Sequence, residues 1–102
     1  MQILKRPQFL LDLAGELNWL KDKAGADVAE RWYQGLLDTI EELKQHPHLG
    51  RKRPDLKPAD IRSWRVKRFP RWLVFYRADG ESLIFLRVRY GMMDLPKSFE
   101  TK

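Results

Sequence analysis

The chain has 102 residues and a mass of 12.2 kDa, the usual size of one domain, so we expect residues 1–102 to form a single compact unit. With 43% hydrophobic residues it can bury a core, which excludes disordered and fibrous classes, and the lack of cysteine excludes disulfides, thiolate nucleophiles and cysteine-based zinc sites. The net charge is +6, but residues 1–50 hold 6 basic and 8 acidic side chains while residues 51–102 hold 14 and 6, and this difference between the halves predicts one strongly positive face.

The first half of the chain predicts two amphipathic helices. Residues 2–6 have an extended character, and Pro7 suits the first turn of a helix, where its missing N–H costs nothing. From residue 8 to about residue 23, leucines recur at spacings of three and four. The predicted buried stripe of this helix is Leu10, Leu13, Leu17 and Leu20.

The second helix is predicted to follow after a short break at residues 24–26. Asp27 is the predicted N-cap, with Glu30 placed as in a capping box, and Pro47 stops the helix after about residue 45. Its predicted buried face consists of Ala29, Trp32, Tyr33, Leu36, Ile40 and Leu43. Because the break is short, we expect the two helices to form an antiparallel hairpin.

The second half changes to a period of two, which indicates strands. Residues 51–60 carry Pro and mixed charge and are predicted to be a loop. Strands are predicted at residues 61–69, 72–77 and 83–90, with turns at 70–71 and 78–81. The predicted fold is therefore α+β, in the order β-α-α-β-β-β, with the helical hairpin packed on one face of a small, mostly antiparallel sheet.

Alternation within the strands sorts side chains by face. In the last strand Ile84, Leu86 and Val88 are predicted to face the helices. The opposite face would then be a cationic surface with two apolar residues, formed by Arg65, Lys67, Arg77, Leu83, Phe85, Arg87 and Arg89. A solvated charged sheet face is the ordinary interpretation of such arginines, but exposed aromatic groups among cations are better suited to contact a partner.

The sequence does not indicate a metal or cofactor. His46 and His48 flank Pro47 at the end of the second predicted helix, where capping explains them better than acid/base catalysis, and two histidines fall short of a usual ligand set. The six glycines are scattered singly, so no phosphate-binding loop is formed. The apolar runs are short and charge follows the first residues closely, so we expect neither a signal peptide nor a membrane span, and a cytoplasmic protein.

The order of several short motifs resembles the RelE/ParE superfamily of bacterial toxins over nearly the whole chain. The motifs are Asp12-Leu13, His46-Pro47-His48-Leu49-Gly50, Ile61-Arg62, Leu73-Val74-Phe75-Tyr76-Arg77 and the run from Leu86 to Leu95, which includes Tyr90, Gly91 and Asp94. The closing strand followed by Gly and Asp-Leu looks more like the ParE branch. The chain differs at Tyr90, where many ParE-like sequences have His, and at Met92-Met93, where the family often has a basic residue.

The resemblance implies a type II toxin neutralised by a cognate antitoxin, with two possible mechanisms. ParE-like members are similar to inhibitors of DNA gyrase that block replication by binding protein, whereas RelE-like members resemble endoribonucleases that cut mRNA on the ribosome. For RNA cleavage, Arg65, Lys67, Arg87, Arg89 and Tyr90 could supply the acid, base and cations. The short C-terminal tail with few clustered cations favours the ParE-like interpretation, and hence a toxin that causes growth arrest without being an enzyme.

The expected partners are gyrase and an antitoxin with an acidic, disordered C-terminal segment, in a hetero-oligomeric toxin-antitoxin complex. The predicted contact residues for target or antitoxin are the cationic surface defined above together with Tyr90 and Asp94. A further alternative from a different class is a basic nucleic-acid-binding domain without toxicity, which would bind free DNA or RNA in a salt-sensitive way.

Overall fold

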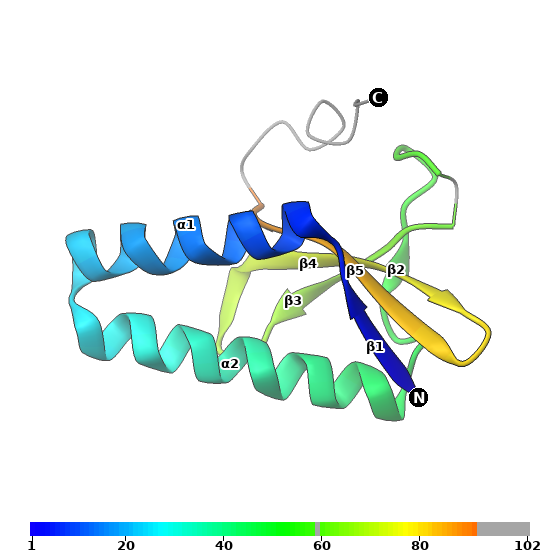
Figure 1. The fold of residues 1–102 in the computed structure, drawn as a ribbon, viewed down its shortest axis with the longest axis horizontal. Coiled ribbons are helices and arrows are strands. Elements are labelled where there is room, and N and C mark those ends of the chain that lie inside the picture. The colour runs from blue at the N-terminus through cyan, green and yellow to red at the C-terminus, as the bar shows by residue number, and fades with distance from the viewer. Residues whose placement is uncertain (59, 92–102) are drawn as a thin grey trace.

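The computed structural model describes residues 1–58 and 60–91, which form two helices and one five-stranded sheet (Figure 1). The elements are β1 (Gln2–Lys5), α1 (Pro7–Ala24), α2 (Ala26–Gln45), β2 (Arg51–Lys52), β3 (Arg62–Val66), β4 (Phe69–Asp79) and β5 (Ser82–Tyr90). The strand order is β1-β5-β4-β3-β2, with β1 parallel to β5 and all other pairs antiparallel. The predicted α+β fold is confirmed, and the short β2 lies inside the segment predicted to be a loop.

Gly25 separates the two helices. Its φ of 98° lies in a region that favours glycine, and its N–H donates to the carbonyl oxygens of Leu20 and Lys21 at the end of α1. Gly25 also occupies the N-cap position of α2, so the prediction of Asp27 as N-cap is wrong. Asp27 lies instead in the first turn, where a carboxylate interacts favourably with the helix dipole.

The buried faces of the helices match the prediction except at two residues. In α1 the core stripe begins at Phe9, which is fully buried, while Leu10 is 48% exposed. In α2 Tyr33 is 36% exposed, and the other five predicted residues are buried. Both errors lie beside the true stripe, because a leucine or an aromatic residue next to a helical stripe fits the same spacing nearly as well.

The turn between β3 and β4 falls at residues 67–68, so the predicted turn at Pro70-Arg71 is wrong and these residues belong to β4. Arg68 has a positive φ of 71°, and the turn is fixed to α2 through Thr39. The Thr39 hydroxyl donates to the Gly35 carbonyl at 2.7 Å and accepts from the Lys67 N–H at 2.8 Å. The backbone of the turn therefore lies directly against that of the helix.

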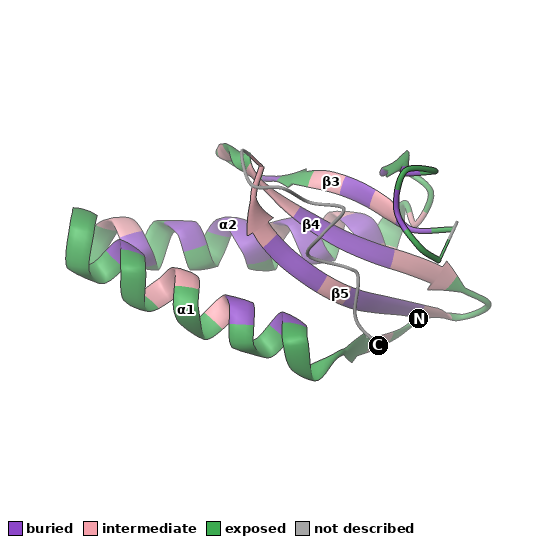
Figure 2. Ribbon diagram, turned by 90° about the horizontal axis from the view of Figure 1, so that it is seen from above, coloured by how far each residue is buried: buried purple, intermediate pink, exposed green. Residues whose placement is uncertain are grey.

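The sheet is covered on both faces. The main core packs the two helices against Val66, Val74, Tyr76, Leu83, Phe85 and Val88. On the opposite face Phe75 packs with Leu56 and Ile61 of the segment that joins β2 to β3. In Figure 2 the buried positions run along the centre of β4 and β5, which lie inside the sheet with a strand on either side.

A bulge in β5 explains why the predicted faces of this strand are wrong. Tyr76 is paired with Phe85 and Phe75 with Arg87, so Leu86 is an extra residue between them. Leu83 and Phe85 are fully buried against the helices and do not belong to a partner-binding surface, while Leu86 packs beside Phe75 on the other face. Val88, beyond the bulge, faces the helices as predicted.

The end of α2 is held by a buried tyrosine. His46 takes the C-cap position, and its backbone N–H donates to the Glu42 carbonyl. The Tyr76 hydroxyl donates to the Pro47 carbonyl at 2.8 Å and accepts from the Gly50 N–H at 2.9 Å. Burial raises the pKa of Tyr76, so the phenol stays a donor across the physiological range. Neither α1 nor α2 is long and apolar enough to cross a membrane.

Two mid-helix glycines give a matched test of this packing. A Cβ on Gly35 would collide with the carbonyl oxygen of Lys67, whereas a Cβ on Gly15 would have no atom within 4 Å. We expect Gly35→Ala to destabilise the fold by about 1–3 kcal/mol through overpacking. Gly15→Ala should stabilise it by up to about 1 kcal/mol, the gain in helix propensity. Urea unfolding measures both, and a shift of the same sign for both variants would contradict the predicted contact.

Candidate functional site

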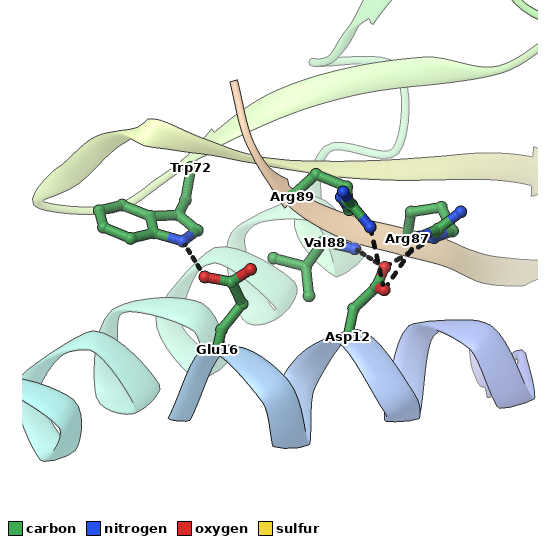
Figure 3. A network of polar contacts seen from close by, with 6 residues as sticks. All are labelled: Asp12, Glu16, Trp72, Arg87, Val88 and Arg89. Atoms are coloured by element: carbon green, nitrogen blue, oxygen red, sulfur yellow. Dashed lines mark hydrogen bonds and ion pairs between the residues drawn. The ribbon is translucent and has the colours of Figure 1, made fainter. Parts of the chain in front are cut away.

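An ion pair joins α1 to the open edge of β5 (Figure 3). β1 pairs with β5 only as far as Phe85, so the edge beyond it must be satisfied by other groups. The Asp12 carboxylate accepts from Arg87 through Nε at 2.7 Å and through the terminal nitrogen at 3.0 Å, and from the Val88 N–H at 3.2 Å. Arg89 lies 3.7 Å from the same carboxylate. Asp12 and Arg87 are both buried, so this bidentate contact holds the helix to the strand.

An open groove lies beside this network, between α1, the start of β4 and the end of β5. We call it the aromatic groove; it has a volume of about 800 Å³ and is lined by Gly15, Glu16, Trp19, Arg71, Trp72 and Tyr90. The indole N–H of Trp72 donates to Glu16 at 2.8 Å, as Figure 3 shows, and the Trp72 ring packs edge-on against Tyr90 at 5.0 Å. Arg71 is exposed at the rim and donates to the Tyr90 hydroxyl at 3.4 Å.

A row of residues crosses the sheet on the face away from the helices. The register pairs Arg65 of β3 with Leu73 of β4, and Leu73 with Arg89 of β5, and Leu73 packs on the Phe75 side of the sheet. Arg65 is exposed and lies over the Trp64 ring at 4.5 Å. Of the predicted cationic surface, Arg65 is therefore exposed and Arg89 is partly exposed. The two residues stand two strands apart, about 10 Å at the usual strand spacing.

Further cations lie at the β3–β4 turn. Lys67 and Arg68 are exposed, and with Arg65, Glu42 and Pro70 they line a hollow of about 280 Å³. Arg68 pairs with Asp38 of α2 at 2.9 Å, and this hydrogen bond lowers the pKa of Asp38. This end of the sheet presents positive charge suited to a carboxylate or phosphate partner.

The remaining predicted site residues lie apart from the exposed cations described above. Arg77 bonds Asp60 at 3.0 Å and thereby lowers the pKa of that carboxyl. Arg87 is buried in its pair with Asp12 and is not part of an exposed cationic surface. Leu83 and Phe85 belong to the core, as described above. Asp94 lies outside the described residues.

The aromatic groove is not predicted by the sequence pattern. Trp19 and Trp72 were both visible as tryptophans outside a predicted buried stripe, and an exposed Trp on a helix was a usable signal. Asp12 was named only as part of the Asp12-Leu13 motif, and nothing in one sequence links it to an arginine 75 positions later.

The sequence matches one family of known proteins and a relative within it. Residues 3–95 match the family described as ParE toxin of type II toxin-antitoxin system, parDE. The chain is 37% identical over 71 residues to Toxin ParE3 of Caulobacter vibrioides, which covers 70% of this chain and 67% of that protein.

Two solved structures share the fold. The chromosomal ParDE toxin-antitoxin system from P. aeruginosa superposes with a TM-score of 0.72 at 19% identity, over 88% of this chain and 95% of that one. The YoeB/ParE toxin from Agrobacterium tumefaciens gives a TM-score of 0.56 at 20% identity, over 88% and 98%. At these identities the structures support the α+β architecture described above.

Proposed function

Because the chain belongs to the ParE toxin family of type II toxin-antitoxin systems, we propose that it arrests growth by inhibiting DNA gyrase and so blocking replication. In this proposal it acts by binding protein and cleaves no RNA itself. Gyrase works on the chromosome, so the site of action would be the cytoplasm.

The buried position of Arg87 is the observation that favours gyrase inhibition over ribosome-dependent RNA cleavage. The RNA-cleaving alternative needs Arg65, Lys67, Arg87, Arg89 and Tyr90 as a set of acid, base and cations. Arg87 is buried and bound at two nitrogens by Asp12. Moving that guanidinium to a phosphate would leave the Asp12 carboxylate buried without its main partner, which is strongly unfavourable.

The antitoxin is proposed to neutralise the toxin by direct contact with the cationic surface. The part that remains exposed after correction for Arg87, Leu83 and Phe85 comprises Arg65 and Lys67, while Arg89 is only partly accessible, with 20% of its side chain exposed. An acidic segment that is disordered when free and folds on contact would complement this charge. The resulting complex would be a hetero-oligomer of toxin and antitoxin.

Expression in a bacterium without the antitoxin tests the function. We expect growth arrest with filamentation and induction of the DNA-damage response, because blocked replication leaves DNA breaks and stops division, while mRNA stays intact. The purified protein should inhibit gyrase supercoiling, and coexpression of the antitoxin encoded with it should restore growth. mRNA cut within codons on translating ribosomes, with supercoiling unaffected, would support the endoribonuclease instead.

A further inference from the structure

A row of exposed cations follows the border of the sheet that lies away from α1. Arg51 of β2 is paired with Ser63 of β3, so it is the diagonal neighbour of Arg65, about 7–8 Å away between backbones. Lys67 follows Arg65 by two residues, about 7 Å further along the chain. All three side chains are exposed, and we call them the cation row.

The border of the sheet is open beside this row. β3 runs along the side of the sheet opposite α1 in Figure 2, and β2 pairs only with its first two residues, Arg62 and Ser63. Beyond Ser63 the outer edge of β3 has no strand partner among the described residues. The hollow of about 280 Å³ at the β3–β4 turn lies at this open part of the edge.

The charges of the cation row are available to an external anion. Within residues 1–58 and 60–91, no carboxylate forms an ion pair with Arg51, Arg65 or Lys67. Arg68, next to Lys67, differs because it is paired with Asp38 at 2.9 Å. The row therefore contributes three positive charges that the fold itself does not use.

The backbone under the row is held rigidly. The Lys67 N–H donates to the Thr39 hydroxyl, and the Lys67 carbonyl oxygen lies so close to Gly35 that a Cβ there would collide with it. Both contacts fix the β3–β4 turn to α2. Cations on a fixed backbone keep their spacing, so less conformational entropy is lost when they bind.

The surface suits a sugar-phosphate backbone better than a folded protein. Protein interfaces are centred on desolvated aromatic or apolar anchors. Trp64, the aromatic residue of the hollow, is half-buried, its ring is covered by the Arg65 guanidinium at 4.5 Å, and its N–H already donates to Glu42. Contacts to DNA phosphates need cations and no such anchor. At 3.4 Å of helix axis per phosphate, a row about 14 Å long spans about four phosphates of one strand.

We propose that the cation row binds the phosphate backbone of the double-stranded DNA on which gyrase acts. The inference rests on the proposed function, because it takes gyrase as the target, and it adds a contact with the DNA to the contact with the enzyme. The acidic antitoxin segment proposed above would occupy Arg65 and Lys67 in place of the phosphates and so displace the DNA.

Fluorescence anisotropy of a short labelled duplex of arbitrary sequence tests the DNA contact. With three phosphate contacts, the logarithm of the association constant should fall with the logarithm of the salt concentration with a slope of about −2.7. In Arg65→Gln/Lys67→Gln the slope should shrink to about −0.9, and the affinity at low salt should fall at least about tenfold. The same variant should inhibit gyrase supercoiling at least fivefold less potently, whereas binding to gyrase without DNA should not change.

Lys21→Gln/Lys23→Gln is the matched control. These lysines are exposed in the last turn of α1, and their removal lowers the net charge by the same amount. We expect the DNA affinity of this variant to stay within twofold of the wild type, with an unchanged salt slope. Melting followed by circular dichroism verifies that both double variants are folded.

Glu42→Gln gives a test in the opposite direction. Glu42 is the acidic residue of the hollow and accepts the Trp64 N–H at 3.3 Å. Glutamine can still accept this hydrogen bond through its amide oxygen, and it removes a negative charge that repels phosphate. We expect DNA binding to strengthen at least twofold, which loss of a merely structural contact would not produce.

The outcomes separate this inference from the proposed function. If the wild type does not inhibit gyrase, the proposed function is overturned, and the contact with gyrase-bound DNA with it. If the wild type inhibits gyrase and Arg65→Gln/Lys67→Gln does so equally well, only the DNA contact is overturned. It is also overturned if both double variants weaken DNA binding equally, since overall charge then explains the binding. Loss of gyrase binding in the absence of DNA would assign the cation row to a protein partner instead.

Discussion

Replacing Asp12 with alanine is expected to destabilise the fold by about 3–5 kcal/mol, because the Arg87 guanidinium would remain buried without its bidentate partner. The Val88 N–H at the strand edge would lose its acceptor as well. Urea unfolding followed by circular dichroism measures the change. For a chain of this size it corresponds to a fall in melting temperature of well over 10 °C.

The double variant Asp12→Leu/Arg87→Met is the informative control for this experiment. Removing both charges together leaves no buried ion, and apolar side chains of similar size can fill the space, so the double variant should be more stable than Asp12→Ala. If Asp12→Ala unfolds at the same urea concentration as the wild type, the network of Figure 3 contributes little to holding α1 on the strand.

Phe85→Ala has the second large expected effect, a destabilisation of about 3–5 kcal/mol. The ring is fully buried, and its centroid lies 5.7 Å from that of the Phe9 ring and 5.9 Å from that of the Tyr76 ring. Truncation to alanine therefore leaves a cavity between α1 and the sheet. Urea unfolding measures this change too.

Leu4→Ala on the neighbouring strand β1 is the control, because Leu4 is 41% exposed and should cost less than 1 kcal/mol. A Phe85→Ala variant with wild-type stability and weakened antitoxin binding would instead place Phe85 on a partner-facing surface.

The type and order of the elements could be predicted because their signals are local. Both helices have clear three-and-four spacing, and Gly25 and Pro47 mark their ends. The Leu10 error shows the limit of this signal, since Phe9 and Leu10 are adjacent hydrophobic residues and spacing alone cannot choose between them.

The faces of β5 could not be predicted because alternation carries no information there. Residues 83–88 include five hydrophobic side chains, and both faces of the strand are covered, so neither register exposes an obviously wrong residue. The bulge at Leu86 then reverses the assignment for half of the strand. A bulge depends on the pairing with β4, which is a property of two strands and is not encoded in either alone.

The candidate site was only partly predictable for the same reason. Arg65 and Arg89 were correctly expected on one face, because strand alternation is preserved at each of them. The aromatic groove combines residues of α1 with residues more than 50 positions later. Its existence follows from the way the helix lies along the sheet, which the sequence pattern does not specify.

The pairing of β1 with β5 determines when this protein can fold during its synthesis. β5 lies between β1 and β4, it ends at Tyr90, and its Val88 N–H binds Asp12 of α1. β1 therefore cannot join the rest of the sheet until the ribosome has released residue 90. The helical hairpin ends at Gln45, which means that roughly 45 further residues must be translated while its apolar side is uncovered. At 5–20 residues per second this interval is on the order of 2–9 s. The apolar side of the hairpin therefore stays uncovered for seconds, and the cationic surface forms only after β5 has been synthesised and has paired with β1 and β4.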